Sequence, residues 1–154
     1  MQLGDILDVD AVKVRSACSS KKRLFQELGE LAAARYGLGA EDVTLALMDR
    51  EALGPTGVGQ GVALPHARLD QVDKVRGLFV MIERPLDFDA VDRQPVDLVF
   101  CLLAPENAGV DHLKALALVS RTLRDANICT KLRANADATT LHMLLTETST
   151  TQAA

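Results

Sequence analysis

A run of closely spaced glycines that ends in a proline and a histidine is the segment of this sequence best suited to chemistry. Pro65 and His66 follow glycines at positions 54, 57, 59 and 61. Because glycine has no Cβ, a bulky group can approach the backbone of such a segment closely. Pro65 has a fixed φ and restricts Leu64 to extended geometry, so we expect the imidazole of His66 to be presented with little freedom. An oriented imidazole is a candidate nucleophile.

The spacing of these glycines differs from that of the common nucleotide-binding loops. The pattern is G-x-G-x-G at 57–61, whereas the dinucleotide fingerprint is G-x-G-x-x-G and a Walker loop ends in Gly-Lys-Ser/Thr. We therefore expect the loop that contains Gly59 and Gly61 to accommodate a group other than a nucleotide.

Two further residues are suited to binding an anion beside His66. Arg50 lies directly before the glycine-rich loop and carries a permanently charged, planar guanidinium that matches phosphate oxygens. His112 follows Asp111 at the predicted start of a helix, where free backbone N–H groups favour an anion. Together these residues indicate phosphate chemistry that requires neither a metal ion nor a cofactor.

Each of these residues also has a plain structural interpretation. His66 could be a surface histidine in a tight turn, Arg50 a solvated charge at a helix end, and His112 a capping side chain. A metal-dependent hydrolase that uses His66, His112 and Asp70 is a second alternative, but no H-x-H or H-x-x-x-H pair supports it. Cys101 lies in an apolar run and is expected to be a buried packing residue rather than a nucleophile.

Strands and helices are predicted to interleave along the chain. The alternating segment 11–15 predicts a short strand, and the apolar runs 77–82 and 96–103 predict two strands that are covered on both faces. A short strand is also expected at 62–64, inside a glycine-rich segment that is otherwise mostly loop. The segment 83–95 contains two prolines and is expected to be an exposed connection.

Helical spacing of apolar residues predicts the remaining elements. Ser19 and Ser20 are candidate N-caps of a first helix, for which Gly37 is a stop signal. A further helix is predicted from Asp111 onward, with an apolar face formed by Leu113, Leu116, Ala117, Val119 and Leu123. Other helices are predicted at 41–53, 128–132 and 137–145, followed by a flexible tail at 149–154. This order of elements predicts an α/β sandwich.

Length and composition indicate one globular domain. The chain has 154 residues, of which 48% are hydrophobic and 25% charged, and its net charge is −4. This charge balance and the 3% aromatic content disfavour nucleic acid and carbohydrate as partners. No apolar run approaches the roughly 20 residues that span a bilayer, so no membrane insertion is expected. Three widely spaced cysteines without a C-x-x-C pair suit a reducing, cytoplasmic location.

Two segments resemble the motifs of a known protein family. The segment 49–66, DREALGPTGVGQGVALPH, resembles the active-site signature of enzyme IIA proteins of the fructose/mannitol class in the bacterial phosphoenolpyruvate phosphotransferase system. The segment 111–116, DHLKAL, resembles the second motif of that family. The resemblance covers essentially the whole chain, and a stand-alone chain of this length is most similar to the nitrogen-regulatory type of IIA protein.

The resemblance implies a fold, a site and partners. It implies a single-domain sandwich with a mixed central β-sheet flanked by helices, in which residues 1–148 form the IIA domain. His66 would be the phosphorylated residue, and the phosphate pocket would contain Arg50, His112, Gly59 and Gly61. The donor would be a histidine-phosphorylated carrier protein of the HPr or NPr type. The protein would act mainly in regulation of nitrogen and potassium metabolism, on a transporter or sensor kinase.

The chain departs from the family pattern beside the acceptor. Pro55 stands where serine is common, Gln60 where asparagine is common, and Ala67-Arg68 where Gly-Lys is common. Pro55 removes one N–H group from the loop, and Ala67 narrows the backbone conformations next to His66. These departures leave the acceptor in place and affect loop geometry and the choice of donor.

Two alternative functions use the same residues. A sugar-specific IIA component would pass the phosphoryl group from His66 to the cysteine of a separate IIB domain. A regulatory binding module would use phosphorylation only as a switch, because the added negative charge changes what the surface binds.

Overall fold

A computed structural model describes the backbone of residues 1–153 and the side chains of residues 1–147. Its helical elements are η1 (Leu3–Asp5), α1 (Lys21–Tyr36), α2 (Ala40–Leu53), α3 (Val110–Leu123), α4 (Ala126–Arg133) and α5 (Ala138–Ala153). Its strands are β1 (Leu7–Arg15), β2 (Gly57–Gly59), β3 (Val62–Ala63), β4 (His66–Leu69), β5 (Arg76–Leu86) and β6 (Val96–Pro105). Of the predicted tail, 149–154, the structure describes only the backbone of 149–153, which belongs to α5. Residue 154 lies outside the described residues.

The strands form one mixed sheet with β6 near its centre. The strand order is β1-β5-β6-β3-β2, and β4 also pairs with β6. β5 and β6 are antiparallel, whereas β1 pairs with β5, and β3 and β4 pair with β6, in parallel. Most residues of β5 and β6 are buried, as expected of strands covered on both faces. The predicted strands at 77–82 and 96–103 are therefore confirmed and extend further in both cases.

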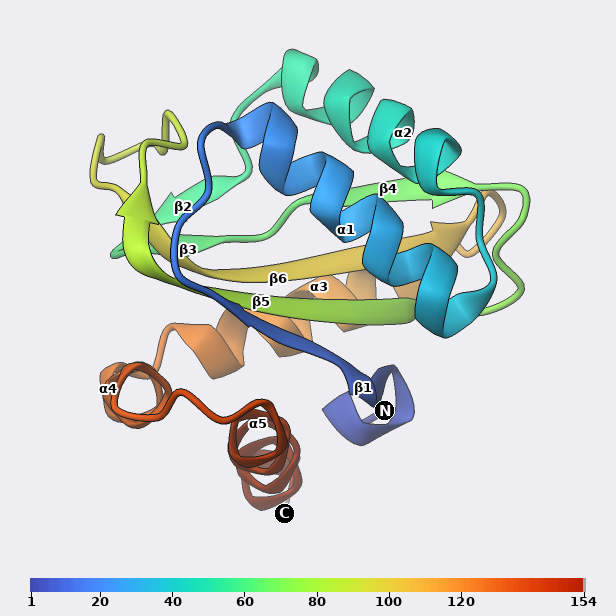
Figure 1. The fold of residues 1–154 in the computed structure, drawn as a ribbon. Coiled ribbons are helices and arrows are strands. Elements are labelled where there is room, and N and C mark those ends of the chain that lie inside the picture. Colours follow the sequence, from blue (N-terminus) through green and yellow to red (C-terminus); the bar gives the residue numbers. More distant parts are fainter. Residues whose placement is uncertain (154) are drawn as a thin grey trace.

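Helices cover both faces of the sheet. Figure 1 shows α1 and α2 on one face and α3, α4 and α5 on the other. The fully buried side chains of Phe79 and Phe100 lie in the core of the sheet, with ring centroids 6.1 Å apart. The predicted α/β sandwich with a mixed sheet flanked by helices is confirmed. Among the described residues, no helix is long and apolar enough to cross a membrane.

β3 and β4 follow the same edge of β6 as one interrupted line. Val62 pairs with Leu98, and His66 pairs with Leu102, so both strands keep the same register along β6. Pro65 lies in the interruption and has no N–H group, but its carbonyl accepts a hydrogen bond from the N–H of Leu102. The line therefore stays attached to β6 on both sides of the proline.

The buried face of α3 differs from the predicted one. Helical spacing counted from Leu113 predicted this residue to face the core, but Leu113 is 64% exposed and Ala117 is also exposed. The helix instead buries the face that contains His112, Ala115, Leu118, Val119, Thr122 and Leu123. Apolar and small residues occupy most positions of this helix, so the sequence pattern fits two buried faces that differ by a rotation of about one residue around the helix axis.

α1 and α2 pack closely through a glycine. Ser20 caps α1 by accepting a hydrogen bond from the N–H of Arg23, and Gly37 ends the helix with φ 69°, as predicted. Gly29, in the middle of α1, faces the start of α2: an added Cβ would lie 2.4 Å from the carbonyl oxygen of Ala40 and 2.6 Å from Oγ1 of Thr44. This contact sets how closely α2 approaches α1, and α2 carries Arg50.

Gly29→Ala is expected to destabilise the protein although alanine is the better helix former. The clash with the backbone of Ala40 requires α2 to move, which costs about 1–3 kcal/mol and exceeds the gain of about 1 kcal/mol in helix propensity. Urea unfolding measures this loss. Gly54→Ala is the control, because an added Cβ at Gly54 meets no atom within 4 Å. Equal stability of the two variants would contradict the packing role of Gly29.

Candidate phosphoryl-acceptor site

His66 occupies the first position of β4 and is half-buried. The sequence predicted mostly loop between residues 54 and 68, apart from a strand at 62–64, and this prediction missed β4. The glycines and prolines there indicate local breaks, whereas the strand depends on pairing with the distant β6. The backbone of His66 is therefore fixed by the pairing of β4 with β6, which extends from His66 to Leu69.

Two hydrogen bonds define the tautomer of His66. Its Nδ1 lies 2.8 Å from the carbonyl oxygen of Leu64, and because a carbonyl only accepts, Nδ1 carries the proton. Nε of Arg50 donates to Nε2 of His66 over 3.3 Å, and because a guanidinium only donates, Nε2 carries the lone pair. The nucleophilic lone pair of the imidazole is therefore on Nε2, next to a guanidinium.

The surroundings keep the His66 imidazole uncharged at neutral pH. Burial is the main cause that lowers the pKa of His66 below its ordinary value. The Arg50 guanidinium lowers this pKa further, while the hydrogen bond to Leu64 and the charge of Glu51 act in the opposite direction. A neutral imidazole retains the lone pair that a nucleophile requires.

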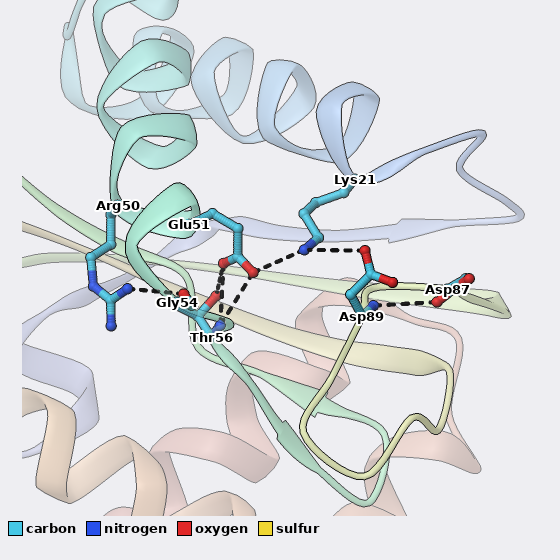
Figure 2. A network of polar contacts seen from close by, with 7 residues as sticks. All are labelled: Lys21, Arg50, Glu51, Gly54, Thr56, Asp87 and Asp89. Atoms are coloured by element: carbon cyan, nitrogen blue, oxygen red, sulfur yellow. Dashed lines mark hydrogen bonds and ion pairs between the residues drawn. The ribbon is translucent and has the colours of Figure 1, made fainter.

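Arg50 is held at the end of α2 by the loop that follows. Its Nη1 donates to the carbonyl oxygen of Gly54 over 3.0 Å (Figure 2). Its Nε faces Nε2 of His66. The guanidinium therefore bridges Gly54, which directly follows α2, and the His66 imidazole. The predicted proximity of Arg50 and His66 is present in the structure.

His112 lies beside His66 in the first turn of α3. The two rings meet edge to face, with centroids 5.6 Å apart. His112 is only 5% exposed, and burial, together with His66 and Arg68, lowers its pKa to about 4. The structure thus brings together two imidazoles that are 46 positions apart in the sequence.

Arg68 is a member of this cluster that sequence reasoning did not assign to the site. Its Nε donates to Nδ1 of His112 over 3.2 Å. Arg68 lies two residues after His66, and alternate residues of a strand point to the same face, so the pairing of β4 explains its position. The missed strand is the reason that Arg68 was noted only as a departure from the family pattern.

A hollow of about 440 Å³ opens beside these side chains. Its lining includes Arg50, Leu53, His66, Arg68 and His112. Leu53 is 85% exposed, and Leu113, next to His112, is exposed as well. The hollow is thus lined by both polar and apolar side chains.

Gly59 and Gly61, predicted in the phosphate pocket, lie elsewhere. They flank the turn between β2 and β3, where their φ values are 105° and 81°. The carbonyl of Gly61 accepts from the N–H of Leu98, whereas His66 pairs with Leu102. Four residues of β6 separate Leu98 from Leu102, a distance of roughly 13 Å along the strand. An added Cβ at Gly61 would contact Arg133 and Asp97. These glycines permit a tight hairpin.

A buried carboxylate fixes the segment between α2 and β2. Glu51 pairs with Nζ of Lys21 at 2.9 Å, and it accepts hydrogen bonds from the N–H and the hydroxyl of Thr56 (Figure 2). Only 8% of the Glu51 side chain is exposed. Lys21 also lies 3.9 Å from Asp89 and over the ring of Phe88. Glu51 therefore ties α1, α2 and the loop together next to Arg50.

Glu51→Gln is expected to lower the free energy of unfolding by about 2 kcal/mol. The amide cannot accept from both Lys21 and Thr56 as the carboxylate does, so the half-buried ammonium of Lys21 loses its short ion pair and keeps only the longer contact with Asp89. Urea unfolding measures the change. Glu30→Gln is the matched control, since Glu30 is 61% exposed and its pair with Arg23 spans 3.8 Å, so a change below about 0.5 kcal/mol is expected. Similar losses in both variants would disprove the role of Glu51.

The remaining candidates from the sequence have structural positions. Cys101 is fully buried in β6 and, as predicted, is a packing residue. His142, to which no role was assigned, donates from Nε2 to the carbonyl of Leu7 over 2.9 Å and joins α5 to β1. Asp70 is exposed after β4. Within the part of the chain that the structure describes, no group of three or more His, Cys, Asp or Glu side chains is arranged to hold a metal ion.

Comparisons with known proteins agree with this geometry. The sequence matches the family described as phosphoenolpyruvate-dependent sugar phosphotransferase system, EIIA 2, over residues 5–148. A nitrogen regulatory protein from Bradyrhizobium diazoefficiens is 48% identical over 145 residues, which are 94% of this chain and 95% of that protein. One from Escherichia coli K12 is 41% identical over 153 residues, 98% and 93% of the two chains.

A solved structure extends the comparison to three dimensions. The crystal structure of nitrogen regulatory protein IIA-Ntr from Neisseria meningitidis superposes with a TM-score of 0.87 at 39% identity, and the match covers 94% of this chain and 99% of that one. The family match and these relatives lead to one conclusion. The chain belongs to the EIIA 2 family of the phosphoenolpyruvate-dependent phosphotransferase system, the IIA phosphocarriers, and is similar to the nitrogen regulatory proteins among them.

Proposed function

We propose that this protein accepts a phosphoryl group on Nε2 of His66 from a histidine-phosphorylated carrier protein of the HPr or NPr type. The single observation that carries the proposal is the hydrogen bond from Arg50 to Nε2, which identifies Nε2 as the lone-pair nitrogen and places a cation beside it. The donor nitrogen–phosphorus bond breaks as the bond to Nε2 forms, and its electron pair stays on the donor imidazole.

The side chains around Nε2 suit the charge of the transferred group. A phosphoryl group in transfer spreads negative charge over its three equatorial oxygens. Once phosphorus occupies the lone pair of Nε2, the guanidinium of Arg50 turns from the nitrogen to these oxygens. His112, whose ring lies edge to face with that of His66, lines the same hollow and supplies a further donor. Because Arg50 already lies beside Nε2, only a small movement of its guanidinium is needed to stabilise this charge.

The surface around the hollow suits a protein as donor. Leu53 and Leu113 are exposed apolar side chains, and such groups near a functional site favour contact with another protein. Both the donor and the acceptor bonds join nitrogen to phosphorus, so transfer is close to balanced and reversible. We propose that the protein works in the cytoplasm, where the free Cys18, Cys101 and Cys129 stay reduced.

The similarity to nitrogen regulatory proteins supports a mainly regulatory role. The phosphorylated and free forms differ by about −1.5 to −2 charges at the hollow that Leu53 lines. A downstream transporter or sensor kinase can recognise this difference. Regulation of nitrogen and potassium metabolism is the proposed outcome. Transfer from His66 to a IIB domain is the alternative, and a chase of labelled phosphate onto a second protein distinguishes the two.

A metal-dependent hydrolase suits this geometry less well. Arg50 and Arg68 each donate to one of the two imidazoles, so both rings lie next to permanent positive charges. A divalent cation bound between His66 and His112 would be repelled by these guanidinium groups.

His66→Ala is expected to abolish phosphoryl uptake and leave the fold intact, because the acceptor is half-buried at a strand end and contributes little to the core. To measure uptake, the protein is incubated with phosphoenolpyruvate, enzyme I and a carrier protein, and acid-labile phosphate is mapped by mass spectrometry. Arg50→Ala is expected to slow uptake at least tenfold, whereas Arg84→Ala, an exposed arginine on β5, should not. Acid-labile phosphate on His66→Ala would falsify the assignment.

His66 and His112 are both expected to gain a proton at a lower pH than an ordinary histidine does. Because the pKa of each is lowered, both rings stay neutral at pH 7 and take up protons as the pH falls below the ordinary value of about 6.5. The expected midpoint is below 6.5 for His66 and about 4 for His112. Two-dimensional NMR of the ring carbons against pH measures both. A His66 midpoint at or above that of free histidine would contradict the burial of the acceptor.

A further inference from the structure

Arg68 and His112 form a contact that the transfer step described above does not use. Nε of Arg68 donates to Nδ1 of His112 over 3.2 Å, and Nη1 of Arg68 lies 3.4 Å from the carbonyl oxygen of Glu106. A guanidinium has donors only and remains protonated in proteins. Nδ1 of His112 must therefore carry a lone pair when this contact is made.

The proton of the neutral His112 ring is consequently on Nε2. This atom is buried and, among the side chains that the structure describes, has no hydrogen-bond partner. A buried donor without a partner is costly, and in a native protein such a group calls for an explanation, a role at a reactive site being one. The ring of His66, 5.6 Å away between centroids, is the adjacent group that would carry one.

The two arginines thus set opposite tautomers in the two rings. Arg50 faces Nε2 of His66, which leaves this nitrogen with its lone pair, whereas Arg68 faces Nδ1 of His112, which leaves Nε2 with its proton. One ring can bond to phosphorus, and the other can donate to a phosphoryl oxygen. With the reverse tautomer, His112 would present a lone pair to a negatively charged oxygen.

We propose that Arg68 is a positioning residue that holds His112 in the Nε2–H tautomer, so that His112 donates a hydrogen bond to the phosphoryl group on His66. The proposal rests on the proposed function, because it assigns a task within phosphoryl transfer. Arg68 acts through His112 and makes no contact with His66 itself. Among the described residues, no carboxylate forms an ion pair with Arg68, so its guanidinium remains available to His112.

Nitrogen NMR of the unphosphorylated protein tests the tautomer directly. Protonated and lone-pair imidazole nitrogens resonate far apart, and the three histidines of the chain can be assigned by single substitution. In the wild type, Nδ1 of His112 should give a lone-pair signal and Nε2 a protonated one. In Arg68→Met both signals should move toward an average of the two tautomers, while Arg68→Lys, which keeps a donor, should preserve the wild-type pattern. Unchanged signals in Arg68→Met would overturn the proposal.

A double-mutant cycle on the rate of phosphoryl uptake tests whether Arg68 acts through His112. Arg68→Met should slow uptake about tenfold, and Arg68→Lys should restore most of the rate. Added to His112→Ala, Arg68→Met should cause no further loss, because the group through which it acts is gone. Equal slowing in both backgrounds would mean that Arg68 contacts the donor protein or the phosphate directly, and would overturn the proposal.

Two controls separate the possible failures. Arg121→Met removes the same charge from an exposed position at the far end of α3 and should leave both the tautomer and the uptake rate unchanged. If the wild type takes up no phosphate, the proposed function fails, whereas the NMR result still decides the tautomer. If uptake is normal and Arg68→Met changes neither measurement, only the role of Arg68 fails.

Discussion

The parallel pairing of β4 with β6 is the constraint on which the site depends. It places His66 opposite Leu102, in the most deeply buried strand of the sheet, and anchors the backbone on both sides of Pro65. An imidazole on a loop would sample many orientations, whereas a residue in a ladder has fixed φ and ψ and only its rotamer to settle. The bond to the Leu64 carbonyl then fixes that rotamer.

Around this fixed point, three elements contribute one cationic or polar side chain each. α2 contributes Arg50, the strand itself contributes Arg68, and the start of α3 contributes His112. α2 and α3 lie on opposite faces of the sheet in Figure 1. The hollow is lined by residues of α2, by the first residues of β4 and by His112 of α3. Buried Glu51 connects the loop after α2 to α1, which extends the support of Arg50 into the core.

Sequence reasoning was successful where the signal is local. The cap at Ser20, the stop at Gly37 and the runs in β5 and β6 depend on neighbouring residues, and the structure has them as predicted. The region around His66 was harder to predict because two effects overlap there. Glycines and prolines between 54 and 65 favour loop, while pairing with β6, more than 30 positions away, makes strands of it.

The errors at the site follow from the same cause. Without β4, nothing in the sequence places Arg68 on the same face as His66. Gly59 and Gly61 are then expected near His66 because they precede it by only a few residues. The orientation of α3 was also open, because Leu113 is as apolar as the residues that are buried. The proximity of His66 and His112 came from the family resemblance, since residues that far apart share no local pattern.

The unbroken register of β3 and β4 along β6 restricts how the length of this chain can vary. An extra residue in the turn near Gln60 would lengthen the hairpin before β3 and leave the pairing of β3 and β4 with β6 in register. An extra residue between Ala63 and His66 would displace everything after it by one step, and because side chains alternate, His66 would turn to the opposite face of the sheet. Insertions and deletions among natural relatives should therefore fall in the turn between β2 and β3 and be absent from positions 63–66.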